Sequence, residues 1–548
     1  MPHEETGKKT IQAVLSSERE NESVVEDSNE SLDAQSSEKY IQKTGKISWH
    51  TFAFWQDRTF RFNLRSFRLS GDPAIRRFSI VEASLLLICA LLASRGLGII
   101  RQSLFNALFG TGPEANAYYA AARLPETLFD LITGGALTHA FIPIFVAYEK
   151  SRSRKEVWQL VSLVFNVMLV VMTLFLLIGE WFAPTLVSHI IVPGYSPSEQ
   201  ALTTSLTRVI LFHPLILGLG TIVTAILNSK RQFLLSALSI AVYNGGLIGG
   251  LLVSLAVPRV GIYGPTYGIL AAAFLQTVVM FPALRKQGMH YYFYWKLSDP
   301  GLRDVLGLLI PNSLAVLVGS VGPILDTAFI SYLPDHSSLA ATQNAQLLYA
   351  LPVALIAQAV GQSLLPHLSN QAENKSYVRM RLTTFKVMGA SILLSLSAAL
   401  IIWLLGKPII HLIFQHGAFK GHSSLLTYLA LTGYVVGLPG IIAGQLFANG
   451  FIALKDTRTP LFTGILALAV RYGLILLFLH TFLGVRLILA VPLSTALSAS
   501  VEALLLCVLL LMRLRKKVAT DKGMARLRQR RLYQQKIAIS SSSGEKFL

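Results

Sequence analysis

Cysteine is nearly absent from this sequence of 548 residues, which contains only Cys89 and Cys507. Both lie in apolar runs far apart along the chain, so they match neither a metal-ligand spacing nor a disulfide framework. Charged residues are also scarce, at 14% of the composition, whereas 53% of the residues are hydrophobic. This balance excludes a soluble protein of ordinary composition and indicates a polytopic membrane protein.

Catalytic motifs are missing as well. The sequence has no Gly-rich phosphate loop after a strand, no His or Cys cluster with metal-ligand spacing, and no nucleophile with a nearby base. We therefore expect no enzymatic activity and no resident cofactor or metal. The net charge of +19 would suggest a nucleic-acid partner in a soluble protein. Here the basic residues lie in short loops and tails between apolar runs, so we attribute them to membrane topology and expect no nucleic acid.

The two ends of the chain are polar. Residues 1–45 hold ten acidic residues against five basic ones and show no apolar period, which predicts disorder. The stretch up to residue 78 mixes basic and aromatic residues, a composition that binds single-stranded nucleic acid or anionic lipid. Its position directly before an apolar run favours lipid. We interpret 1–78 as a cytoplasmic extension and 513–548 as a basic cytoplasmic tail.

Between these ends the sequence contains about twelve apolar stretches that are long enough to cross a bilayer. They lie near 79–108, 115–147, 156–182, 200–227, 233–256, 263–284, 302–332, 338–368, 378–405, 423–450, 460–480 and 487–512. Alternate loops are rich in Lys and Arg, which predicts that these loops and both termini are cytoplasmic. The stretches divide into a lobe over 79–284, a cytoplasmic linker over 285–301 and a lobe over 302–512.

A short internal repeat supports two lobes of six helices each. Leu124 and Pro125 are followed nine residues later by Gly134, and Leu351 and Pro352 are followed at the same spacing by Gly361. The two copies lie six stretches apart, as expected for parallel repeats related by an axis along the membrane normal. The sequence thus predicts an all-α membrane protein of two parallel lobes around a central cavity, which rock to give alternating access.

Several charged side chains lie inside the first two apolar stretches. Ser94, Arg95 and Arg101 belong to the first, and Arg123 and Glu126 share one face of the second with Asp130. A charge at the bilayer centre costs about 2.5–3.5 kcal/mol, so these groups need a polar cavity. Because the planar guanidinium fits phosphate oxygens, we expect an anionic, phosphate-bearing substrate.

Alternatives remain for each of these groups. Arg101 is near the end of its stretch and could extend to the interface. Arg123 and Glu126 could simply neutralise each other. Asn116 is a weaker candidate for the substrate site, because a membrane asparagine more often bonds a neighbouring helix. Asp326 is a carboxylate in mid-span, which predicts coupling to a proton or a monovalent cation. Its alternative is pairing with a basic residue such as Arg471.

The motifs resemble a known family. The run Ser94-Arg95-x-Leu97-Gly98-x-x-Arg101, the turn Phe109-Gly110-x-Gly112 and the segment Ala122-Arg123-Leu124-Pro125 are similar to the first two helices of MurJ (MviN) proteins. Further similarity covers Phe414-Gln415-x-Gly417 and Lys455-Asp456-x-x-Thr459-Pro460. This family flips lipid II in bacterial peptidoglycan synthesis and belongs to the multidrug/oligosaccharidyl-lipid/polysaccharide exporter superfamily.

The resemblance implies a lipid II flippase of the bacterial inner membrane. Ser94, Arg95 and Arg101 would line the cavity and meet the pyrophosphate, and Asp326 would lie where some members bind a cation. Lipid II, membrane lipids and proteins of cell-wall synthesis and division are the implied partners. The sequence departs from the family at Asn116, where relatives carry an acid. Many relatives also have fourteen helices rather than about twelve.

Three rival functions remain open. An ion-coupled exporter of small organic cations would place carboxylates and aromatic residues in the cavity. A flippase for another polyprenyl-linked glycan would share the cationic site. A scaffold for cell-wall enzymes would use the charged tails for docking and would tolerate loss of Arg95.

Overall fold

The computed structural model describes residues 96–132, 136–230 and 232–544, and these are almost entirely helical, without a β-strand. The first described helix covers 96–109. The helices that follow are α3 (Pro113–Ile132), α4 (Ala136–Ser151), α5 (Arg154–Leu186), α6 (Pro197–Ile210), α7 (Phe212–Ser229), α8 (Phe233–Ala256), α9 (Tyr263–Lys286), α10 (Pro300–Ser331), α11 (Ser338–Val353), α12 (Ala359–Glu373), α13 (Tyr377–Phe414), α14 (Gly421–Val436), α15 (Leu438–Ala453), α16 (Arg458–Thr481) and α17 (Ala490–Gly544). Short helical turns η2 (Val187–Ile191), η3 (Pro258–Val260), η4 (Ala354–Gln358) and η5 (Gly484–Leu489) connect some of them.

This is the architecture of a multi-span membrane protein. Within the described residues, eight helical segments are long and apolar enough to cross a bilayer, or nine if the bent pair α14 and α15 forms one span. Large apolar side chains are exposed along one side of α13, where Leu393, Leu396, Leu400 and Leu404 are each more than half exposed. Such a continuous apolar surface is expected to face lipid rather than water.

The helices coincide with the apolar stretches expected from the sequence, with breaks that hydropathy did not predict. The stretch over 115–147 is divided into α3 and α4, and the stretch over 200–227 into α6 and α7 just before Pro214. The stretch over 338–368 contains η4, a π-helical segment of five residues that begins two residues after Pro352. A proline removes one helical hydrogen bond, so a local change of helix geometry beside it is expected.

Two helices begin with the same local device. Ser153 before α5 accepts a hydrogen bond from the amide of Glu156, whose carboxylate accepts one from the amide of Ser153. Ser196 and Glu199 form the same reciprocal pair before α6. These capping boxes satisfy amide groups that have no partner in the first helical turn, and they fix where the long apolar helices start.

Helices α3 to α9 pack mainly against one another and form the N-lobe, which we define with the helix 96–109 as residues 96–286. Its tightest helix pair is α8 with α9. A Cβ atom on Gly250 would lie 2.6 Å from Cα of Gly268, so the two backbones touch directly. Small residues allow this approach between membrane helices and increase their van der Waals contact.

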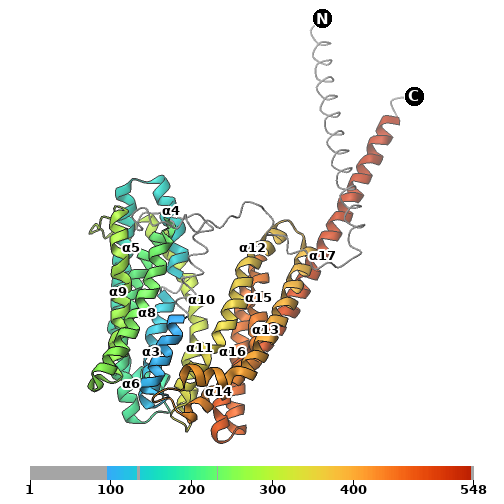
Figure 1. The fold of residues 1–548 in the computed structure, drawn as a ribbon. Coiled ribbons are helices and arrows are strands. Elements are labelled where there is room, and N and C mark those ends of the chain that lie inside the picture. The colour runs from blue at the N-terminus through green and yellow to red at the C-terminus, as the bar shows by residue number, and fades with distance from the viewer. Residues whose placement is uncertain (1–95, 133–135, 231, 545–548) are drawn as a thin grey trace, which may run out of the picture. The chain divides into compact units, whose positions relative to one another are not determined.

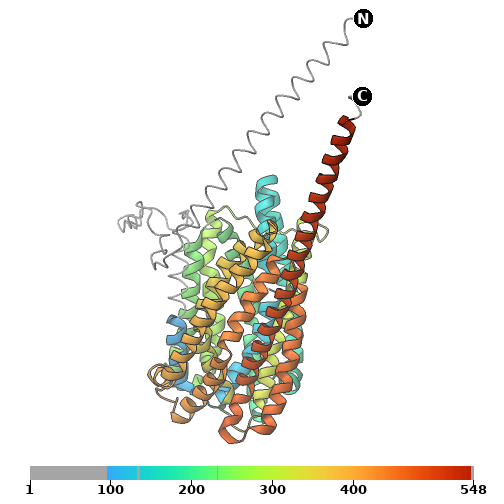
Figure 2. The same cartoon turned by 90° about the vertical axis from the view of Figure 1, so that its right-hand side faces the viewer.

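Helices α11 to α17 pack together in the same way (Figure 1). With α10, which follows the linker in sequence but contacts mainly N-lobe helices, we define them as the C-lobe, residues 300–544. The final helix α17 lies beside α15 and α16, and its red C-terminal part extends beyond them (Figure 2). The two lobes contact each other chiefly through α10 and α11 among the described elements.

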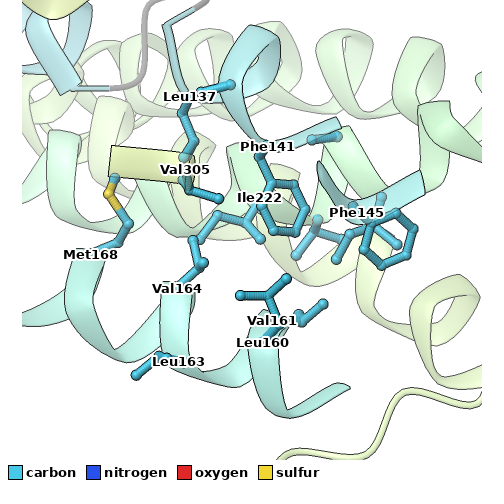
Figure 3. Close-up of a cluster of buried hydrophobic side chains, with 14 of the residues drawn as sticks. Leu137, Phe141, Phe145, Leu160, Val161, Leu163, Val164, Met168, Ile222 and Val305 are labelled. Atoms are coloured by element: carbon cyan, nitrogen blue, oxygen red, sulfur yellow. The ribbon is translucent and has the colours of Figure 1, made fainter. Parts of the chain in front are cut away.

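The first turns of α10 are buried in the N-lobe, although the sequence placed this helix in the second lobe. Leu302, Val305 and Leu309 join an apolar cluster built mainly by α4, α5 and α7. Figure 3 shows Val305 beside Ile222 in this cluster. Close van der Waals packing holds apolar membrane helices together, so these buried side chains attach this end of α10 firmly to the N-lobe.

Candidate functional site

Ser94 and Arg95 lie outside the described residues. The site is therefore built from Arg101 in the helix 96–109, Arg123 and Glu126 in α3, and Asp326 in α10. The sequence predicted all four as site residues. The structure brings Arg123 of α3 into contact with α10 and α11 of the C-lobe.

Arg123 connects the two lobes. Its Nε donates to Oγ1 of Thr327 at 3.0 Å, and its Nη2 donates to Oε1 of Gln343 at 2.8 Å. Its Nη1 lies 3.4 Å from Oε2 of Glu126 one turn along α3. The guanidinium therefore uses two of its three nitrogen atoms for hydrogen bonds to the other lobe. The predicted Arg123–Glu126 pair exists, but it is the longest of the three contacts.

Glu126 is the accessible partner of this pair. Its side chain is 54% exposed, whereas that of Arg123 is 12% exposed. Asp130, one turn further along the same face, is also exposed. The charges of Arg123 and Arg101 both act on Glu126. Because an exposed ion pair at 3.4 Å contributes little free energy, an incoming anion can compete for these guanidinium groups.

Arg101 is half-buried in the helix 96–109. Its guanidinium makes no hydrogen bond or ion pair with another described residue, and its charge acts on Tyr118, Tyr119 and Tyr243 as well as on Glu126. Arg101 is thus a cation that no other described side chain pairs with directly. Such a guanidinium retains donors for a ligand with several oxygen atoms.

Asp326 is not a lone carboxylate, which corrects the premise of the sequence prediction and supports its alternative. Asp326 forms an ion pair with Arg471 of α16, and both side chains are nearly buried. Among the described residues, Oδ1 of Asp326 and Nε of Arg471 have no hydrogen-bond partner. Such a pair is strongly held, because removing one charge would leave the other buried and unpaired.

Asn116 lies apart from these charges. Its side chain is buried, and its amide group donates to the carbonyl oxygens of Thr111 and Gly112, both at 3.1 Å. Its Oδ1 accepts a hydrogen bond of 2.7 Å from the amide of Ala340, in the first turn of α11. In this conformation Asn116 caps a helix of the other lobe, and its polar atoms are occupied by protein groups.

The sequence analysis missed a group of buried amides that also joins the lobes. Asn344 of α11 exchanges hydrogen bonds of 2.9 and 3.2 Å with Asn106, and it accepts one of 2.8 Å from Gln102. Gln102 also donates to Oη of Tyr119 at 2.5 Å. The sequence signal that could have identified them was the presence of three amide side chains within apolar helices. A buried amide in a membrane needs a hydrogen-bond partner on another helix.

Two glycine turns meet beside these amides. Gly110 and Gly417 both have φ of +58°, and the amide of Ala418 donates to the carbonyl of Ala107 at 2.8 Å. A Cβ atom on Gly417 would collide with the Ala107 carbonyl, and one on Gly110 would lie 2.7 Å from the Ala418 carbonyl. Both positions therefore require glycine for its left-handed backbone and for close approach.

We call these contacts the interlobe junction: Gln102, Asn106, Gly110, Asn116, Arg123, Thr327, Gln343, Asn344 and Gly417. Most of them lie in the second half of the helix 96–109, the last turns of α10 and the first turns of α3 and α11, so they gather toward one end of the lobes, whereas Arg123 lies midway along α3. The lobes are joined at the end that carries the loops 110–112 and 332–337. The described residues contain no group of three potential metal ligands.

Comparison with known proteins identifies the family. The family model described as "Lipid II flippase MurJ" matches residues 105–538. The chain belongs to the MurJ family. A probable lipid II flippase MurJ of Rhizobium meliloti is 27% identical over 71% of this chain and 73% of its own length. The lipid II flippase MurJ of Burkholderia cenocepacia is 28% identical over 67% of this chain and 72% of its own length.

Solved structures agree with the MurJ assignment. A structure titled lipid II flippase MurJ, inward closed conformation, aligns with a TM-score of 0.66 at 25% identity, covering 77% of this chain and 86% of that one. An inward-facing multidrug resistance MATE family transporter aligns with a TM-score of 0.67 at 16% identity, covering 79% of this chain and 99% of that one. The second likeness shows that this chain shares the fold of that transporter.

Proposed function

We propose that this chain flips lipid II across the bacterial inner membrane, with its pyrophosphate held by Arg101 and Arg123. The position of Arg123 carries the proposal. It lies in the second predicted span, forms hydrogen bonds to the opposite lobe and faces an exposed carboxylate. The MurJ family assignment supports lipid II as the cargo. Arg95 belongs to the same proposal on the basis of sequence resemblance.

The proposed mechanism is alternating access. Positive charge in alternate loops places the interlobe junction at the outer end of the lobes, so this conformation is closed to the outside. A pyrophosphate entering from the cytoplasmic side would take the place of Glu126 beside Arg123 and bind the free donors of Arg101. Charge-assisted hydrogen bonds to phosphate are stronger than the long pair they replace, and the Arg123 contacts to Thr327 and Gln343 would then be released.

Coupling to a proton or monovalent cation at Asp326 remains a proposal that now includes Arg471. The guanidinium of Arg471 already neutralises Asp326, so a cation can bind only where Oδ1 is open or after Arg471 moves away. We propose that breaking this ion pair accompanies one step of the transport cycle. The rate of flipping by the Asp326→Asn variant should then no longer depend on an ion gradient imposed across the membrane. If the rate depended on the gradient as it does in the unchanged protein, Asp326 would have no coupling role.

We further propose that both termini face the cytoplasm and that the chain works as a transporter without catalytic chemistry of its own. The basic loops 148–155 and 228–232 lie at the same predicted side as the tail after residue 513. The charged extensions are available to proteins of cell-wall synthesis and division. Labelling of cysteines placed in residues 1–45 from the outside of intact cells would contradict this orientation.

Complementation tests the proposed function. A bacterial strain depleted of its own lipid II flippase is supplied with this chain, and growth and lipid II accumulation are measured. Arg101→Ala and Arg123→Ala should each reduce flipping about 10- to 100-fold, because each removes a charge-assisted contact of about 1.5–3 kcal/mol. The matched control is Arg208→Ala, because Arg208 pairs at 3.7 Å with Glu180 within the N-lobe. Equal activity of all variants at equal expression would refute the proposal.

A second candidate is export of a small organic cation. The exposed carboxylates of Glu126 and Asp130 on one face of α3 favour it. A cation exporter should lose activity in Glu126→Gln and Asp130→Asn and keep it in Arg101→Ala. The opposite result, with lipid II accumulating in the Arg101 variant, would support the flippase.

A further inference from the structure

Two adjacent hollows lie at the end of the C-lobe opposite the interlobe junction. The larger, of about 710 Å³, is lined by Lys375, Tyr377, Leu509, Met512, Arg513, Lys516, Lys517 and Thr520. The smaller, of about 340 Å³, is lined by residues that include Lys455 and Glu373. Tyr377 and Lys517 border both, and we call the pair of hollows the basic groove. The groove lies outside the residues used in the proposed transport site.

The charge of the groove is strongly one-sided. Four of the residues that line the larger hollow are cationic, and none of its lining residues is a carboxylate. Arg513 is partly neutralised by Asp456, at 2.6 Å. The Lys517 ammonium lies 5.1 Å from the centre of the Tyr377 ring, which holds this cation at the boundary of the two hollows. Lys375 and Lys516 form no ion pair with a carboxylate of another described residue, so the groove offers positive charge for a ligand.

The backbone at two lysines of the groove is unusual. Lys375 and Lys455 have φ of +53° and +59°, and they are the two non-glycine residues with positive φ in the described chain. They follow the ends of α12 and α15, a position where glycine is the common residue because it has no Cβ. The sequence instead has lysine at both. A positive φ is unfavourable for lysine, and such strained residues are often found where a side chain contacts a ligand. A charged side chain held in this way at a concave surface therefore points to a ligand.

The floor of the groove is apolar. Leu509 and Met512 belong to the last apolar turns of α17, and Met512 is 54% exposed. The basic residues begin at the next position, Arg513, so the groove lies where the apolar span meets water. A soluble phosphate would use the cations but not this exposed apolar surface. A phospholipid uses both, because its headgroup and acyl chain meet at the same level of the bilayer.

We propose that the basic groove binds the headgroup of an anionic phospholipid, with its phosphate between Lys375, Lys516 and Lys517 and an acyl chain along Leu509 and Met512. The proposal is independent of lipid II transport. The acid-rich segment 1–45 of the same chain is the competing occupant by charge. Its apolar residues, such as Val14, Leu15 and Val24, lie between charged and polar residues that would have to enter the apolar level beside Met512 with them. The lipid therefore fits the observations better.

Lipid binding to the full-length chain tests the proposal. The purified protein is titrated with phosphatidylglycerol and, in parallel, with zwitterionic phosphatidylcholine, and bound lipid is measured by native mass spectrometry. Replacing Lys375, Lys516 and Lys517 together by alanine should weaken phosphatidylglycerol binding about 100-fold and leave phosphatidylcholine unchanged. The charge-matched control replaces exposed Arg285, Arg303 and Arg379, which lie outside the groove. Equal losses in both triple variants would show a general charge effect and overturn the proposal.

A cross-linking experiment does not depend on the folding of the triple variant. In an otherwise unchanged chain, Met512→p-benzoylphenylalanine is irradiated in phosphatidylcholine vesicles that contain phosphatidylglycerol. An adduct with the mass of phosphatidylglycerol, in excess over its share of the vesicle lipid, is expected. Adducts in proportion to bulk lipid, or a cross-link to a peptide from residues 1–45, would overturn the proposal.

Discussion

The two halves of α10 contact the N-lobe differently. The first half places Leu302, Val305 and Leu309 in a large apolar cluster. The second half combines a smaller apolar cluster around Ile330 with a hydrogen bond from Arg123 to the hydroxyl of Thr327. The hydroxyl of Ser331 likewise accepts a hydrogen bond of 3.0 Å from the amide of Gly194. Hydrogen bonds at the loop end can be exchanged for bonds to water with a small net change in free energy, whereas separating a large packed cluster loses its van der Waals contacts. We infer that the first half is the firmer attachment and the second half the more separable one.

The largest effect on stability should come from the first half. Leu302 is buried, and Leu302→Ala should lower the free energy of unfolding by about 2–5 kcal/mol because it leaves a cavity in the cluster. Flipping per folded molecule should stay unchanged. Thermal unfolding of the purified protein and flipping in vesicles measure the two quantities. A variant of normal stability that no longer flips would break the distinction between the halves of α10.

The next effect should come from the glycine turns of the junction. Gly417→Val combines an unfavourable positive φ with a collision against the Ala107 carbonyl, so it should shift the lobes toward opening at this end by about tenfold or more. Spin labels at Glu114→Cys and Lys420→Cys, with Cys89 and Cys507 replaced by alanine, report the distance between the lobes.

Gly484→Val is the control for backbone strain. Gly484 has φ of +59°, but a Cβ atom there would meet nothing within 4 Å. Gly484→Val should therefore lower the free energy of unfolding by about 1–2 kcal/mol, the penalty for a positive φ at a residue with a Cβ. It should not change the distance between the spin labels. If both glycine variants changed the distance equally, the collision across the junction would not be the cause.

A smaller shift is expected from the buried amides. Asn344→Leu would leave Gln102 and Asn106 without their partner across the junction, at a penalty of about 1–3 kcal/mol for buried unsatisfied groups. That corresponds to a shift toward separated lobes of roughly tenfold. Gln346→Leu is the matched control, since Gln346 donates at 2.8 Å to Tyr434 within the C-lobe. Its distance distribution should remain that of the unchanged protein.

The location of the helices was predictable, because a membrane span needs a long apolar run whatever its neighbours are. The partners of polar groups were not. Asp326 and Arg471 are separated by 145 positions, and the sequence offered this pair only as an alternative to a lone carboxylate. Asn116 was a weaker candidate for the substrate site, and in this structure its side-chain oxygen caps α11 of the other lobe, as its alternative had it. Hydropathy shows that a polar residue is buried but not which helix faces it.

The sequence did not show how the two ends of α10 contact the N-lobe, for the same reason. Its first turns read as the beginning of a second lobe, because the basic linker 285–301 precedes them. Their burial in the N-lobe depends on how α4, α5 and α7 are arranged around Val305 (Figure 3). Ser94 and Arg95, the residues that carried the family resemblance, lie outside the described chain, so their place in the site stays a prediction.

The smallest effect should come from ion pairs at the surface of the junction end. His336 lies 2.9 Å from Glu199 of the N-lobe, and its side chain is 54% exposed. Because solvent screens such a pair, His336→Gln should shift the lobe equilibrium by no more than about 1 kcal/mol, or roughly fivefold. His422→Gln is the control, since His422 contacts Asp335 at 2.7 Å within the C-lobe and should not shift it at all. A larger shift for His336 than for Asn344→Leu would mean that the surface pair, not the buried amides, holds the lobes together.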